Sequence, residues 1–123
     1  TDVVIFSPAE IRVSLNGNYI AFDQPPVIEN SRTLVPMRAI FEAFGAVVTW
    51  NQETKTVTGT LDGKVVTLTV GDKTSFVNGE AATLDVPAQI INGRTMVPVR
   101  FISESLDADV QWIQSPMTVV ITK

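Results

Sequence analysis

The sequence of 123 residues contains no cysteine and no histidine. Without cysteine the chain forms no disulfide, holds no thiolate-bound metal and has no cysteine nucleophile. Without histidine it lacks the commonest general base and the commonest ligand of transition metals. We therefore expect a protein that is not an enzyme and that needs neither a cofactor nor a metal ion.

Positive charge is also scarce, with nine Lys+Arg against thirteen Asp+Glu and a net charge of −4. Nucleic acid binding depends on neutralising phosphates, so nucleic acid is excluded as a partner. The apolar runs are four or five residues long, which is too short for a membrane span. A content of 45% hydrophobic and 18% charged residues is typical of a globular protein with its own core.

The second half of the chain repeats the first. Residues 13–60 align with residues 75–122 without a gap, and 20 of the 48 aligned pairs are identical. The matches include Asn-Gly, Asp-x-Pro and Arg-Thr-x-Val-Pro-x-Arg runs, and a tryptophan follows in each copy. The sequence therefore predicts a tandem duplication, and residues that this alignment pairs are called counterparts.

Turn signals divide each copy into strands. Asn16-Gly17, Asn78-Gly79 and Asp62-Gly63 are typical of two-residue turns in β-hairpins. Polar connections with prolines are expected over residues 23–32 and 85–94.

A short helix and a strand follow each connection. Pro36 and Pro98 suit the first position of a helix, where a missing N–H costs nothing. Gly45 and Asp107 then suit a left-handed helix end. Alternation over Ala108–Trp112 predicts a strand with one buried face.

We therefore predict an α+β fold made of two tandem copies of a unit in which a short helix packs on an antiparallel β meander. The expected parts are an N-terminal strand over residues 1–10, a first unit over residues 11–62 and a second unit over residues 63–123. Together the two units are expected to form one compact module.

The two ends of the sequence carry copies of the two arms of one hairpin. When the alignment is extended in the same register, Val3–Phe6 copies part of the segment 64–70, and Thr118–Thr122 copies Thr56–Thr60. We expect two complementary strand edges, which proteins normally cover. The expected assembly interface consists of Val3, Val4, Ile5, Phe6, Thr118, Val119, Val120, Ile121 and Thr122.

Two ways of covering these edges are open at this point. The strands can pair within one chain and close the domain. They can also pair between subunits, which gives a head-to-tail contact and hence a ring or an open filament.

The motif that runs from Asn92 to Ile102, Asn-Gly-Arg-Thr-Met-Val-Pro-Val-Arg-Phe-Ile, resembles the copper amine oxidase N-terminal-like domain, and the first copy resembles it too. The resemblance implies a non-catalytic part of secreted and surface-anchored proteins of Gram-positive bacteria. It implies an extracellular or cell-surface location. No signal peptide is visible in the sequence, so Thr1 is expected to be the start of a mature chain from which the signal peptide has been removed. The copper site of the oxidases uses histidines and a modified tyrosine, whereas this chain has no histidine and a single tyrosine, Tyr19.

Charged motif residues have a functional and a structural interpretation. Arg38 and Glu42, like Arg100 and Glu104, are spaced i, i+4 on a predicted helix. This spacing favours an ion pair within each helix over a charged pocket that binds an anion. Arg32 and Arg94 precede the helices and are expected to bind loop carbonyls.

Aromatic and acidic residues offer further candidate sites. Trp50 and Trp112 lie on the apolar phase of a strand and are expected to be buried against the helix rather than to stack on sugars, which leaves Tyr19 as the exposed aromatic. Asp107, Asp109 and Gln111 offer oxygens to calcium, but no loop supplies six or seven ligands.

The sequence therefore predicts a non-enzymatic extracellular structural protein that assembles with itself head-to-tail, as a filament or surface layer. In it the N-terminal strand of one subunit completes the sheet of a neighbour at the C-terminal strand. The alternative is a monomeric module that binds cell-wall polysaccharide as part of a larger surface protein.

Overall fold

The computed structural model describes residues 10–123, in which β-strands predominate. Strands account for 50% and helices for 13% of these residues. The expected α+β fold of two tandem copies is therefore wrong. Each connection between hairpin and helix, expected to be irregular, contains strand residues instead, and the two halves share a sheet.

The secondary structure consists of two helices and thirteen strands within the described range. The strands of the first half are β1 (Arg12–Leu15), β2 (Asn18–Tyr19), β3 (Val27–Glu29), β4 (Arg32–Pro36), β5 (Val47–Asn51) and β6 (Thr56–Leu61). The strands of the second half are β7 (Lys64–Thr69), β8 (Thr74–Val77), β9 (Glu80–Thr83), β10 (Gln89–Ile91), β11 (Arg94–Pro98), β12 (Asp109–Ile113) and β13 (Thr118–Thr122). The helices are α1 (Met37–Phe44) and α2 (Val99–Ser105).

A central sheet of order β10-β11-β4-β3 joins the two halves. Its middle pair is antiparallel, and Val35 lies opposite Val97, its own counterpart in the repeat. Leu34 lies opposite Pro98 and Pro36 opposite Met96, so the pairing is unchanged when the halves are exchanged. The domain therefore has a pseudo-twofold axis through the Val35–Val97 pair.

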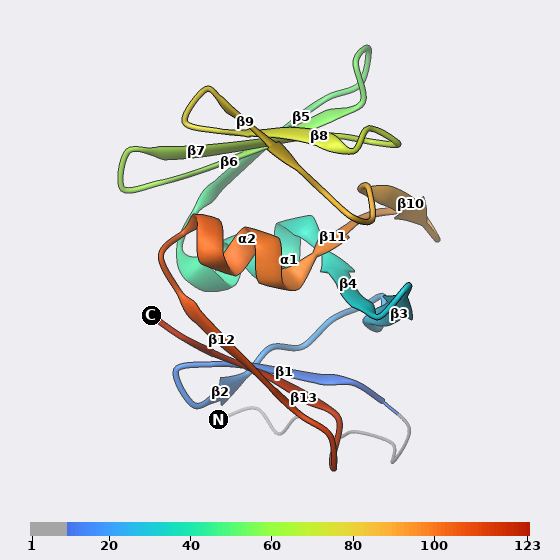
Figure 1. Ribbon diagram of the computed structural model, residues 1–123, viewed down its shortest axis with the longest axis vertical. Coiled ribbons are helices and arrows are strands. Elements are labelled where there is room, and N and C mark those ends of the chain that lie inside the picture. The colour runs from blue at the N-terminus through green and yellow to red at the C-terminus, as the bar shows by residue number, and fades with distance from the viewer. Residues whose placement is uncertain (1–9) are drawn as a thin grey trace.

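Two outer sheets lie on either side of the paired helices (Figure 1). One has five antiparallel strands in the order β5-β6-β7-β8-β9, and we call it the complete sheet. The other has the order β12-β13-β1-β2, and we call it the short sheet. In the repeat alignment β12, β13, β1 and β2 are the counterparts of β5, β6, β8 and β9, so among the described strands β7 alone has no counterpart in the short sheet.

Each helix begins one residue after the proline of the repeated motif, which was expected to occupy the first helical position itself. Pro36 and Pro98 are extended N-caps that end β4 and β11. Gly45 ends α1 in the left-handed conformation (φ 85°), and Asp107 adopts φ 65° after α2. The tolerance of glycine and aspartate for this conformation explains the sharp reversal into the next strand.

Asn-Gly and Asp-Gly turns form the expected hairpins, because both residues of each turn adopt positive φ. Two further hairpins of this kind were not expected. They turn at Asn30-Ser31 between β3 and β4 and at Asn92-Gly93 between β10 and β11. The Asn-Gly signal was present at the second of these turns but lay within a segment interpreted as a loop.

A single main core collects residues from both halves. It includes Val13 and Ile121 of the short sheet, Phe41 of α1, Ile102 of α2 and Val66 of the complete sheet, all fully buried. Because helices and all three sheets share this cluster, neither half buries its apolar face alone.

In the first half a large helix residue packs against a glycine of the neighbouring strand. A Cβ added to Gly59 of β6 would lie 2.2 Å from Cε1 of the buried Phe41 ring. In the second half the counterpart of Gly59 is Ile121 of β13, and the counterpart of Phe41 is Ser103 of α2. The larger side chain is thus on the strand in this half and on the helix in the other.

Substitution Gly59→Ala is expected to lower the free energy of unfolding by about 1–3 kcal/mol, because the methyl group overlaps the Phe41 ring in a packed core. Urea titration followed by circular dichroism measures the change. Thr60→Ala, at the exposed neighbouring position, is the control and should change stability little. Equal stability of both variants would contradict this account of the core.

Candidate functional site

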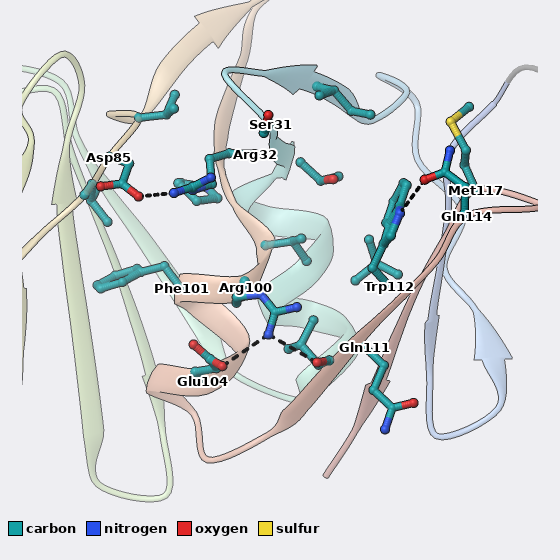
Figure 2. A pocket seen from close by; sticks show the side chains of 18 of the residues that line it. Ser31, Arg32, Asp85, Arg100, Phe101, Glu104, Gln111, Trp112, Gln114 and Met117 are labelled. Atoms are coloured by element: carbon teal, nitrogen blue, oxygen red, sulfur yellow. Dashed lines mark hydrogen bonds and ion pairs between the residues drawn. The ribbon is translucent and has the colours of Figure 1, made fainter.

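Two grooves are related by the pseudo-twofold axis. One encloses about 760 Å³ and the other about 790 Å³. Each groove is lined by a helix and a tryptophan-bearing strand of one half and by a hairpin of the other half. This hairpin is β3–β4, with Arg32, in the first groove and β10–β11, with Arg94, in the second. Figure 2 shows the first groove, where Arg32 reaches towards Asp85 and Trp112 lies across from α2.

Ion pairs between the halves close one end of each groove. Arg94 donates to Oδ2 of Asp23 from Nε at 2.9 Å and from a terminal nitrogen at 2.5 Å. Across the axis, a terminal nitrogen of Arg32 donates to Oδ2 of Asp85. The expectation that these arginines bind loop carbonyls is therefore wrong. The signal for the pairing was that both the aspartate and the arginine recur in each copy of the repeat.

The two predicted helical ion pairs differ. Arg100 contacts Glu104 at 3.4 Å and also donates to the carbonyl of Val110 at 3.2 Å (Figure 2). No ion pair between Arg38 and Glu42 is found among residues 10–123, although both line the second groove. The sequence spacing therefore predicted one pair correctly and not the other.

Aromatic side chains differ between the two grooves. Trp50 is partly buried and packs against the main core, as expected. Trp112 is 39% exposed, so its expected burial is wrong, and its indole N–H donates to Oε1 of Gln114 at 3.1 Å (Figure 2). Tyr19 is 47% exposed, in line with the expectation for it.

Two aspartates are stabilised in their charged form. The hydrogen bond from Arg94 lowers the pKa of Asp23 below its usual value. The hydrogen bond from Lys64, at 2.9 Å, likewise lowers the pKa of Asp107. The carboxylate of Asp107 is thus paired with Lys64. Residues 10–123 contain no cluster of three or more acidic side chains placed to hold a metal ion.

The C-terminal strand β13 is not a free edge. It pairs antiparallel with β12 and parallel with β1, so both of its sides are hydrogen-bonded. The expectation that Thr118–Thr122 presents an unpaired edge is therefore wrong. Its expected partner, Val3–Phe6, lies outside the described residues.

The sequence profile of the family described as the copper amine oxidase N-terminal domain matches residues 14–121. The chain belongs to this family. The match covers both copies of the repeat, so the family's domain corresponds to the whole pseudo-symmetric fold.

Two curated proteins share this region. The chain is 32% identical over 113 residues to a protein named protease inhibitor from Brevibacillus choshinensis, which covers 90% of this chain and 34% of that protein. It is 31% identical over 101 residues to a primary amine oxidase from Klebsiella aerogenes, which covers 80% of this chain and 13% of the oxidase. The chain thus spans about a third or less of the length of these relatives.

Neither helix of the described part is long and apolar enough to cross a membrane.

The ion pair of Asp23 predicts a dependence of stability on pH. A lowered pKa in the folded state stabilises the protein above the unfolded pKa, near 4, and this stabilisation is lost as the pH falls through the folded pKa. Asp23→Asn is expected to be less stable than the wild type at pH 7, and the difference should shrink below about pH 4.

Urea unfolding from pH 3 to pH 7 measures this difference. Glu53→Gln, in the exposed turn between β5 and β6, is the control. A gap between the wild type and Asp23→Asn that stays constant down to pH 3 would contradict the role of the pair.

Proposed function

We propose that this chain is a non-catalytic, extracellular structural subunit that polymerises head-to-tail through its N-terminal segment. The family description supports the non-catalytic part, since it names the N-terminal domain of an amine oxidase. The lack of histidine and cysteine in the sequence agrees with it. The extracellular location rests on the family resemblance alone.

The observation that carries the proposal is the difference between the two outer sheets. The complete sheet has β7 (Lys64–Thr69) between β6 and β8, whereas their counterparts β13 and β1 pair directly with each other, with no described strand between them. In the extended repeat alignment the counterpart of β7 is the segment 2–7, which includes Val3–Phe6. This segment therefore resembles the strand that is missing from the described short sheet, since Val3 and Val4 match Val65 and Val66 and Phe6 stands at the position of Leu68.

The turn that follows this segment favours a neighbouring subunit over the same chain. In the complete sheet the β7–β8 turn needs Gly71 at φ 81° and an Asp72 side chain that accepts from the N–H of Thr74 at 2.8 Å. The backbone N–H of Val70 also donates to the carbonyl oxygen of Lys55 at 2.9 Å.

The counterparts of these three turn residues are Pro8, Ala9 and Glu10. Proline has no N–H to donate, and a left-handed alanine costs about 1–2 kcal/mol. The longer glutamate is poorly suited to the local hydrogen bond that aspartate makes. The same tight hairpin is thus disfavoured at the N-terminus, and an extended segment reaches another subunit more easily.

Docking of the N-terminal segment on the next subunit is a heterologous contact. Such a contact generates an open filament unless the rotation between subunits closes a ring. We propose the filament.

A second candidate function is suggested by the relative named protease inhibitor, which matches 90% of this chain. The proposal is that the domain binds a protease, and titration of the chain against purified serine and cysteine proteases tests it. A monomeric module that binds cell-wall polysaccharide through Tyr19 or exposed loop residues stays an alternative prediction.

Deletion of residues 1–8 is expected to abolish assembly and to leave a folded monomer, because every described strand and helix lies outside the deletion. Negative-stain electron microscopy and light scattering measure assembly, and circular dichroism checks the fold. A synthetic peptide of residues 1–8 should slow polymerisation of the intact chain by occupying the docking site. Polymers of the deletion variant like those of the intact chain would refute the proposal, as would an intact chain that stays monomeric.

The triple change Pro8→Val, Ala9→Gly and Glu10→Asp gives the N-terminal turn the residues of the β7–β8 turn. We expect this variant to insert its own segment and to stay monomeric, since an intramolecular partner has an effective concentration on the order of millimolar. The control combines Ala9→Ser with Glu10→Gln, which builds no such turn and should still polymerise. Light scattering against protein concentration distinguishes the two, and unchanged assembly of the triple variant would contradict the role of the turn.

A further inference from the structure

We infer that the parallel pair β1–β13 is a closed slot, and that assembly opens it so that the N-terminal segment of a second copy inserts between the two strands. This inference rests on the proposed function and specifies its site. The donor strand enters the interior of the short sheet, where it takes the position that β7 has in the complete sheet. The pair β1–β13 is then an autoinhibitory contact of the unassembled subunit.

The register of β1 against β13 is the main observation. In the complete sheet Thr67 of β7 lies between Thr58 of β6 and Phe76 of β8. The counterparts of these two outer residues are Val120 and Ser14, and in the short sheet they lie directly opposite each other.

The neighbouring residue of β7 shows the same relation between the two sheets. Val66 lies between Gly59 and Val77 in the complete sheet, and their counterparts Ile121 and Leu15 are direct partners in the short sheet. The short sheet thus keeps the alignment of a five-stranded sheet from which the middle strand has been removed and the gap closed.

The closed pair is also the one parallel contact among the described strand pairs. Parallel pairing is slightly less stable per residue than antiparallel pairing. Insertion replaces this single ladder by two antiparallel ladders, as β7 makes in the complete sheet. The strands must separate by about one strand spacing, roughly 4.8 Å, to admit the donor.

The side chains of the donor segment suit the core. Val66 and Leu68 of β7 are buried, and their counterparts are Val4 and Phe6. Phe41 of α1 lies against Gly59 of β6, and its counterpart on α2 is Ser103, whose Oγ is buried without a hydrogen-bond partner in the described part of the chain. The donor segment thus brings apolar side chains to two positions that are buried in the complete sheet.

A disulfide that locks the slot tests the inference, and the natural chain has no cysteine to interfere. Ser14→Cys with Val120→Cys joins β1 to β13 at directly opposite positions, which suits disulfide geometry. Gln111→Cys with Val120→Cys is the matched control, because it joins β12 to β13, a pair that insertion leaves intact. We expect the oxidised slot variant to stay monomeric and to polymerise after reduction, and the oxidised control to polymerise in both states.

A second pair of variants reads the register of the donor. Ile5→Cys with Val120→Cys should form disulfide-linked ladders of subunits on a denaturing gel, because Ile5 is the counterpart of Thr67. Val4→Cys with Val120→Cys places the two thiols on opposite faces of the sheet and should give no ladder.

The outcomes separate the inference from the proposed function. Polymers of the oxidised slot variant would overturn insertion and leave assembly by another contact. Ladders from the Val4 variant in place of the Ile5 variant would overturn the register. An intact chain that never polymerises would overturn the proposed function itself.

Discussion

The antiparallel pairing of β4 with β11 holds the two halves of the chain in one domain. It places Val35 opposite its own counterpart Val97, which creates the pseudo-twofold axis. Each proline that ends these strands starts a helix, so the axis also fixes α1 against α2. The helices in turn separate the two outer sheets (Figure 1).

Contacts between the halves follow from this axis. Because β4 and β11 run side by side in opposite directions, the arginine at the start of each strand is carried to the aspartate of the other half. These pairs are exposed and each contributes little to stability by itself. Their effect is to fix the hairpins that form the groove walls.

Local signals predicted local structure correctly. The Asn-Gly turns, the prolines before the helices and Gly45 all act through the φ angles of a few adjacent residues, and these depend little on the rest of the chain. The repeat and the family were also evident from the residues themselves.

Non-local features were not predictable in this way. The pairing of β4 with β11 joins Val35 to Val97, which lie far apart in the chain, and no turn signal specifies it. Trp112 is exposed although it lies on the apolar phase of its strand, and the described structure has no Arg38–Glu42 pair although the i, i+4 spacing favours one. Thr118–Thr122 was expected at an edge because strand counting along the chain does not reveal that β1 takes the vacant side of β13.

Fusion of two copies into one chain has a consequence that a symmetric dimer of half-length chains would not share. In such a dimer any change in one outer sheet appears in the other as well. Here the complete sheet has five strands and packs Gly59 against Phe41 of α1, whereas the short sheet has four described strands and carries Ile121 where α2 has Ser103 as the counterpart of Phe41. One outer sheet can thus stabilise the fold while the other changes in sequence and strand number. The covalent link between the copies permits the two sheets to differ in this way.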